Sequence, residues 1–218
     1  MKNIIFDLDG TLWDATFVTV DAWKNIFDRH PESTFNGIID HETVCSYMGL
    51  AADEVAKLLF GDSAEGKLLM DECCDVENEL LWDRGGILYE NVEETVKLLH
   101  NNGYRLCIVS NCQDGYIETF LHAHGLSEYF VDIESCGRTG LDKAENIRLI
   151  MERNRFRKAV YVGDTDGDGR AARAAGIPFI YVKYGFGERF GRGRSKDHDA
   201  SIENISELED TIAKLFGK

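Results

Sequence analysis

Basic residues are scarce in this 218-residue chain. Lys and Arg together number 24 against 39 Asp and Glu, so the formal net charge is −15 at pH 7. Such an acidic chain repels nucleic-acid phosphates at long range, and we therefore expect no nucleic acid among its partners. An anionic substrate would have to be held by a local device, such as a metal ion or a few placed cations.

Paired cysteines, prolines and long apolar runs are also few or missing. No two of the 6 cysteines have C-x-x-C spacing, which gives no sign of a zinc site, and we expect reduced thiols in a cytoplasmic protein. With only 2 prolines and 44% apolar residues, the chain has the composition of a folded domain rather than a disordered one. The first apolar run, residues 4–6, is too short for a signal peptide, and no segment approaches a membrane span. We therefore expect no membrane partner.

The chain does contain short apolar runs that alternate with helical patterns. The runs predict strands at residues 3–6, 105–110, 131–134, 159–163 and 179–182. They lack a two-residue alternation, which is typical of strands that are covered on both faces. Strands that alternate with helices predict an α/β fold with a doubly wound parallel sheet. One helix is expected to begin with a capping box formed by Asn91 and Glu94.

The segment from residue 15 to residue 84 breaks this alternation, because it contains helical patterns and no convincing strand. We interpret it as a helical insertion after the first strand, with a hinge at each end. The prediction is a sheet domain made of residues 1–14 and 86–218, and an all-helical cap domain made of residues 15–85.

Polar residues stand where the expected strands end, which is where doubly wound sheets bind their ligands. They are Asp7 and Asp9 after the first strand, Ser110 and Asn111 after the second, Lys143 in the helix after the third, and Asp164 after the fourth. Carboxylates a few ångströms apart raise one another's pKa unless a cation joins them. Mg²⁺ is a hard cation that takes oxygen ligands and also bridges to a phosphate, so the three acids favour a magnesium site.

Taken together, these motifs resemble the haloacid dehalogenase-like hydrolase superfamily. The matching stretches are "DLDGT" at 7–11, "SN" at 110–111, Lys143 within "TGLDKAENI", and "GDTDGDGRAARAAG" at 163–176. They follow one another in the family's order over the whole expected sheet domain. The helical insertion after the first motif resembles the helical cap of the family's phosphoglycolate phosphatase-like members. The resemblance implies a Rossmann-like core and a Mg²⁺-dependent phosphatase that acts on a small organic phosphomonoester.

The resemblance also implies roles for individual residues. Asp7 would be the nucleophile that becomes an aspartyl phosphate, and Asp9 the general acid and base. Asp7 and Asp164 would bind the metal through their carboxylates and Asp9 through its backbone carbonyl, with Asp168 supporting the metal site from just outside. Lys143 would neutralise charge on the phosphoryl oxygens.

The remaining positions that the resemblance implies bind the substrate. Ser110 and Asn111 would hydrogen-bond the phosphoryl group, while Gly10 and Thr11 would form the turn beside it. The cap is expected to select the substrate, and its candidates are Tyr47, Met48 and Gly49. We expect a monomer.

Several alternatives were weighed against this interpretation. A phosphomutase of the β-phosphoglucomutase type would keep the same core residues and differ only in the cap. A non-enzymatic phospho-aspartate switch and a dehalogenase are both disfavoured by Asp9. "DTDGDG" at 164–169 resembles the start of an EF-hand, but the twelfth position is Ala175 instead of the required Glu. The role of Asp166 stays open, and the basic, glycine-rich stretch 185–196 is expected to be an exposed loop.

Overall fold

The computed structural model describes residues 2–31, 39–189 and 197–217. Within these ranges a six-stranded parallel sheet has the strand order β5-β4-β1-β6-β7-β8. Its strands are β1 (Asn3–Phe6), β4 (Arg105–Ser110), β5 (Phe130–Ser135), β6 (Val160–Gly163), β7 (Phe179–Val182) and β8 (Ala200–Ile202). The first five coincide with the predicted strands to within a residue at each end. The edge strand β8 was not predicted.

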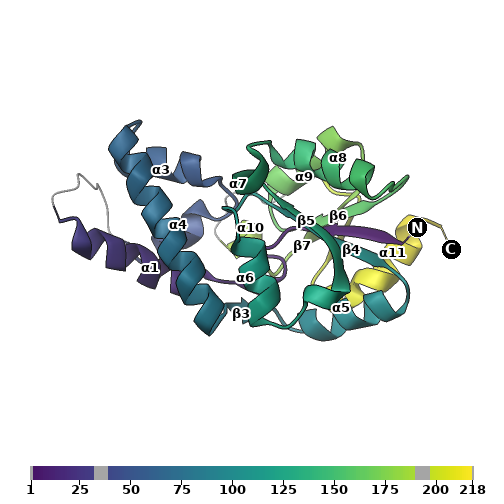
Figure 1. Ribbon diagram of the computed structural model, residues 1–218. Coiled ribbons are helices and arrows are strands. Elements are labelled where there is room, and N and C mark those ends of the chain that lie inside the picture. Colours follow the sequence, from purple (N-terminus) through teal and green to yellow (C-terminus); the bar gives the residue numbers. More distant parts are fainter. Residues whose placement is uncertain (1, 32–38, 190–196, 218) are drawn as a thin grey trace.

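Helices cover both faces of this sheet (Figure 1). On one face, α8 and α9 pack against a core built around Ile5, Cys107 and Tyr161. On the other, α5, α6 and α11 pack against a larger core that includes Phe6 and Ile108. The helices of this part are α5 (Val92–Asn101), α6 (Tyr116–Ala123), α7 (Cys136–Thr139), α8 (Lys143–Arg153), α9 (Asp166–Ala175), α10 (Phe186–Arg189) and α11 (Leu208–Leu215), with short 3-10 turns at Ser127–Tyr129 and Ile205–Glu207. The doubly wound α/β fold is thereby confirmed.

A second group of helices projects from one end of the sheet, at the left of Figure 1. It consists of α1 (Thr16–Arg29), α2 (His41–Tyr47), α3 (Ala52–Phe60) and α4 (Ala64–Arg84). These helices share a core of their own, centred on Trp23, Val44 and Cys73. Helix α2 was not predicted. From the separate core we propose that the cap comprises residues 15–85.

A two-stranded ribbon joins the helical group to the sheet. Strands β2 (Trp13–Asp14) and β3 (Ile87–Leu88) pair antiparallel, with Trp13 opposite Leu88. The buried Trp13 ring packs edge-on against Tyr116 and Phe120 of α6, at centroid distances of 5.4 and 5.1 Å. The connection is therefore anchored in the sheet domain by a large aromatic side chain.

The sheet register brings the predicted site residues to one edge. Phe6 lies opposite Ile108 on β4 and opposite Val162 on β6. These three strands therefore end at nearly the same height, and the residues that follow them share the carboxyl edge of the sheet.

The predicted capping box at the start of α5 is wrong. Asn91 does precede the helix, but it adopts a left-handed conformation and its side chain makes no capping hydrogen bond. Its amide instead donates to Asn204 Oδ1 at 3.1 Å, so a tertiary partner replaces the local one. Across the described ranges, no helix combines the length and apolar character that crossing a membrane requires.

Candidate active site

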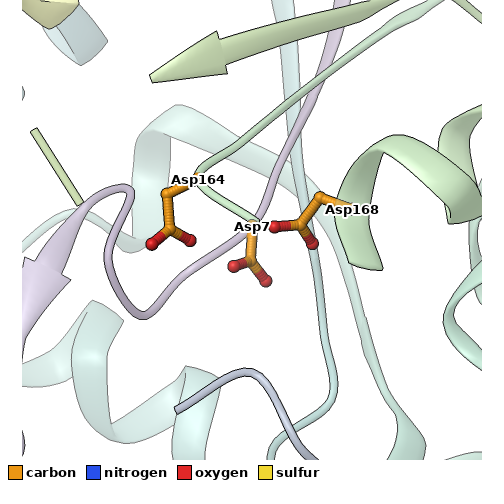
Figure 2. Close-up of side chains that lie close together, drawn as sticks. All are labelled: Asp7, Asp164 and Asp168. Atoms are coloured by element: carbon orange, nitrogen blue, oxygen red, sulfur yellow. The ribbon is translucent and has the colours of Figure 1, made fainter. Parts of the chain in front are cut away.

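Three acidic side chains meet at the carboxyl edge of the sheet. Asp7 follows β1, Asp164 follows β6, and Asp168 lies in the first turn of α9; all three are buried. One oxygen of each lies within 4.8 Å of the others. Figure 2 shows the three carboxyl groups gathered around a common space. This is the arrangement expected of a site for a divalent cation with oxygen ligands.

The two carboxylate oxygens of Asp164 differ in their hydrogen bonding. Its Oδ2 accepts hydrogen bonds from the backbone N–H groups of Phe186 and Gly187, at 2.6 and 3.1 Å. Its Oδ1 is buried and has no hydrogen-bond partner among the described residues. A buried carboxylate oxygen without a partner is unfavourable, and a bound cation would satisfy it. The residues present therefore fit a metal ion.

Lys143, the first residue of α8, lies between two of the acids. Its buried Nζ donates to Asp7 Oδ1 at 2.8 Å and to Asp168 Oδ1 at 2.6 Å. The other oxygen of Asp168 accepts from the backbone N–H and the hydroxyl of Thr165, at 2.9 and 2.6 Å. Both oxygens of Asp168 are thus engaged, so this residue holds Lys143 in place at the same time as it caps α9.

Burial and the charges of neighbouring acids raise the pKa values of Asp7 and Asp164. Burial, together with the charge of Asp168, raises the pKa of Asp7 to about 7, although Lys143 opposes the rise. Burial and the same charge raise the pKa of Asp164 well above its usual range. One lysine is too little positive charge for this cluster, which again agrees with a divalent cation.

Asp9 occupies a different environment two residues along the chain. Its Oδ1 accepts hydrogen bonds from Trp13 Nε1 and from the Tyr116 hydroxyl, each at 2.9 Å. Burial, and secondarily the charge of Asp7, raises the pKa of Asp9 to about 8. The side chain is therefore held in one orientation and retains a proton near neutral pH.

Gly10 and Thr11 shape the turn and do not line the pocket. Gly10 has φ +79°, and a Cβ at this position would overlap the carboxylate of Asp164. Thr11 is held through its backbone, because its carbonyl accepts from the Tyr184 hydroxyl at 2.9 Å. The Thr11 hydroxyl is buried without a partner in the described part of the chain, so the side chain adds no hydrogen bond to the turn.

A small pocket lies between the carboxyl edge and the helical group, with a free volume of about 60 Å³. The predicted residues that line it are Asp7, Asp9, Ser110, Asn111 and Lys143 from the sheet side and Tyr47, Met48 and Gly49 from the cap side. The Asn111 amide donates to the Gly49 carbonyl at 2.9 Å, which ties the two sides together. Of the predicted site residues, Gly10, Thr11, Asp164 and Asp168 do not line this cavity, and all the others do.

Sequence reasoning missed four residues of this pocket with hydroxyl, carboxyl or amide side chains: Thr19, Glu77, Gln113 and Tyr116. One signal for Glu77 was present, because it shares the buried face of α4 with Cys73, Cys74 and Leu81. A carboxylate on an apolar helix face calls for an explanation.

The sequence leaves the role of Asp166 open and predicts an exposed loop for the glycine-rich stretch 185–196. Asp166 forms an ion pair with Arg170 one turn along α9 and is not one of the three acids that meet at the carboxyl edge. The start of the glycine-rich stretch forms α10, where Phe186 and Gly187 bind Asp164. Residues 190–196 of that stretch lie outside the described residues.

Comparisons with known proteins agree with this architecture. The family model of the haloacid dehalogenase-like hydrolases matches residues 4–182. A phosphoglycolate phosphatase of Photobacterium profundum is 28% identical, over 97% of this chain and 96% of its own length.

Two solved structures show the same fold at lower identity. A crystal structure described as a predicted phosphoglycolate phosphatase, from Haemophilus somnus, superposes with a TM-score of 0.82 at 18% identity, covering 96% of this chain and 97% of that one. A β-phosphoglucomutase of Clostridium difficile superposes with a TM-score of 0.76 at 16% identity, covering 99% and 97%. The chain therefore belongs to the haloacid dehalogenase-like hydrolase family, and it is a phosphatase-type hydrolase similar to the phosphoglycolate phosphatases.

Proposed function

We propose that this protein is a Mg²⁺-dependent phosphatase that hydrolyses a small organic phosphomonoester through an aspartyl phosphate on Asp7. One observation supports this most strongly. Asp7 lies in the wall of a small pocket, is hydrogen-bonded to Lys143, and lies within 4.8 Å of a carboxylate oxygen of Asp164, whose Oδ1 has no partner among the described residues.

The metal would be held by the carboxylates of Asp7 and Asp164 and by the backbone carbonyl of Asp9, with Asp168 close by. When bound, Mg²⁺ supplies positive charge that lets an anionic phosphoryl group approach an anionic nucleophile. The fit to this chain rests on the donor set, which consists of oxygen atoms alone, and on the unpartnered oxygen of Asp164.

In the first step a carboxylate oxygen of Asp7 forms a bond to phosphorus as the bond to the ester oxygen breaks. Lys143 orients Asp7 and offsets charge on the phosphoryl oxygens. Asp9 donates its proton to the departing alkoxide, for which its raised pKa prepares it. Trp13 and Tyr116 keep Asp9 in position for this transfer.

In the second step water attacks phosphorus and regenerates the Asp7 carboxylate. Asp9, now ionised, accepts the proton of this water. Ser110 and Asn111 hydrogen-bond the phosphoryl group in both steps. The small free volume of the pocket, about 60 Å³, supports a small ester as the substrate. The relatives' named substrate, phosphoglycolate, falls in this size class.

The test measures inorganic phosphate released from acetyl phosphate and from small phosphomonoesters. EDTA should abolish release and added Mg²⁺ should restore it, and Asp7→Asn should abolish it with an unchanged circular dichroism spectrum. Asp166→Asn removes an acid of the same motif that pairs with the exposed Arg170, and should retain full activity. Turnover by Asp7→Asn, or full wild-type turnover in EDTA, contradicts the proposal.

Replacing Asp9 by Asn removes the proposed proton donor at nearly constant size. Phosphate release should fall by about 10² to 10⁴-fold. Unchanged turnover would instead favour the phospho-aspartate switch. Free phosphate as the product separates a hydrolase from a phosphomutase, which returns the group to a sugar.

We also propose that the protein is a cytoplasmic monomer that binds neither nucleic acid nor membranes. The free thiols of all six cysteines support a reducing compartment. The net charge of −15 supports the exclusion of nucleic acid.

A further inference from the structure

One buried carboxylate of the pocket has no part in the mechanism above. Glu77 of α4 is only 5% exposed and lines the pocket together with Asp7 and Asp9. Its Oε1 accepts from the Thr19 hydroxyl at 2.6 Å, and its Oε2 accepts from Gln113 Nε2 at 3.1 Å. A carboxylate oxygen accepts about two hydrogen bonds, so each oxygen keeps one lone pair for a further donor.

The environment of Glu77 does little to stabilise its charge. Burial raises its pKa to about 7, and the two hydrogen bonds only partly oppose this. No ion pair to Glu77 is formed within the described ranges. Its neighbours on the same helix face are Cys73, Cys74 and Leu81, so an apolar residue would suit the packing better. A buried carboxyl group at such a position is typical of a functional role.

The other residues that line the pocket indicate which substrate groups Glu77 could bind. In the described part of the chain, the one lysine or arginine that lines the pocket is Lys143, and Asp7 and Asp168 already bind it. The cap side contributes apolar residues, the acid Glu77 and the uncharged polar groups of Thr19, Trp23, Tyr47 and Cys74. A leaving group that carried a carboxylate would thus meet a buried acid and no cation, whereas one with a hydrogen-bond donor would meet a free acceptor.

We propose that Glu77 binds the organic part of the substrate, and that this part carries a hydrogen-bond donor, a hydroxyl or an ammonium group, in place of a carboxylate. Thr19 and Gln113 hold the Glu77 carboxyl group in position, one from α1 of the cap and the other from the loop after β4. This inference rests on the proposed phosphatase function and narrows its substrate class.

The first test uses the wild-type enzyme with Mg²⁺ and four esters of matched length. They are 2-hydroxyethyl phosphate, 2-aminoethyl phosphate, ethyl phosphate and phosphoglycolate. The kcat/KM of the hydroxyethyl or the aminoethyl ester should exceed those of ethyl phosphate and phosphoglycolate by at least about tenfold. The better of the two donor esters identifies the donor as a hydroxyl or an ammonium group.

The second test replaces Glu77 by Gln. The amide keeps the size of the side chain, can accept from Gln113 through its oxygen, and can donate to the Thr19 hydroxyl. The ratio of kcat/KM between the preferred donor ester and ethyl phosphate should fall by about tenfold. Glu79→Gln is the matched control, because it makes the same substitution at an exposed position of α4, and it should leave this ratio unchanged. Thermal unfolding verifies that both variants are folded.

The outcomes separate this inference from the function on which it rests. Phosphoglycolate turnover equal to or faster than that of the donor esters overturns the inference and leaves the phosphatase function intact. If a folded Glu77→Gln variant keeps the wild-type ratio of kcat/KM between the donor ester and ethyl phosphate, Glu77 is not the residue that binds the donor group. Failure to release phosphate even from acetyl phosphate in the presence of Mg²⁺ overturns the proposed function itself.

Discussion

Replacing Lys143 by Met would leave a buried charge cluster without its cation. The methionine keeps the length of the apolar stem but removes Nζ, which now bonds Asp7 at 2.8 Å and Asp168 at 2.6 Å. All three side chains are buried, with the lysine 7% exposed. Water in the pocket can reach Asp7, but Asp168 is fully buried and does not line the pocket, so its lost partner is not replaced by solvent.

The expected loss of stability follows from this burial. Removal of one partner of a buried ion pair lowers the free energy of unfolding by about 3–5 kcal/mol, because the remaining charge is left uncompensated. For a chain of this size, 1 kcal/mol corresponds to about 2–4 °C in Tm, so the variant should unfold about 6–20 °C below the wild type. The loss should be smaller at pH 5 than at pH 8, since Asp7, whose pKa burial raises to about 7, can then take up a proton.

Urea and thermal unfolding in EDTA measure this effect without a bound metal. Lys158→Met, at an exposed position, is the control and should change the free energy of unfolding by less than about 0.5 kcal/mol. The double variant Lys143→Met/Asp168→Asn should recover part of the loss, because it removes one unpaired acid. Equal midpoints for Lys143→Met and the wild type at pH 8 would refute the argument that Lys143 compensates the buried acids.

Two further predictions concern Glu77 and Gly10. The pKa of Glu77 rises from 4.5 to about 7 on folding, so the stabilisation by its protonated form is complete below pH 4.5 and is lost as the pH rises through about 7. In urea titrations, the free energy of unfolding of the wild type relative to Glu77→Gln should therefore fall by about 3 kcal/mol between pH 4.5 and pH 8. A difference that stays constant with pH would contradict the burial of a titrating carboxyl group. Gly10→Ala should lower the free energy of unfolding by about 1–3 kcal/mol and abolish Mg²⁺-dependent phosphate release, because its Cβ would displace Asp164. Gly61→Ala is the control: Gly61 has φ +74° and open space around it, so this variant should carry the same backbone strain but keep full activity. Equal losses of activity in the two variants would contradict the role assigned to the contact between Gly10 and Asp164.

Local pattern was enough to predict the sheet and most of the site. Five strands of the six-stranded sheet were found because buried strands are continuous apolar runs, and polar residues that follow such runs must lie at one edge of a parallel sheet. Asp7, Asp9, Lys143 and Asp164 were therefore identifiable from order and spacing alone. The three-residue edge strand β8 was missed, because so short a run has no readable period.

What the sequence alone determined was thus which residues end the strands and where a helical segment interrupts them. Only the tertiary structure decided which groups meet across that interruption. Glu77 joins Thr19, 58 residues away, and Gln113, 36 residues away, and Asp164 is held by backbone amides 22 and 23 residues further on. Such partners leave no mark at helical or strand spacing, because hydrogen bonds between distant segments depend on how those segments pack together and not on the period of either.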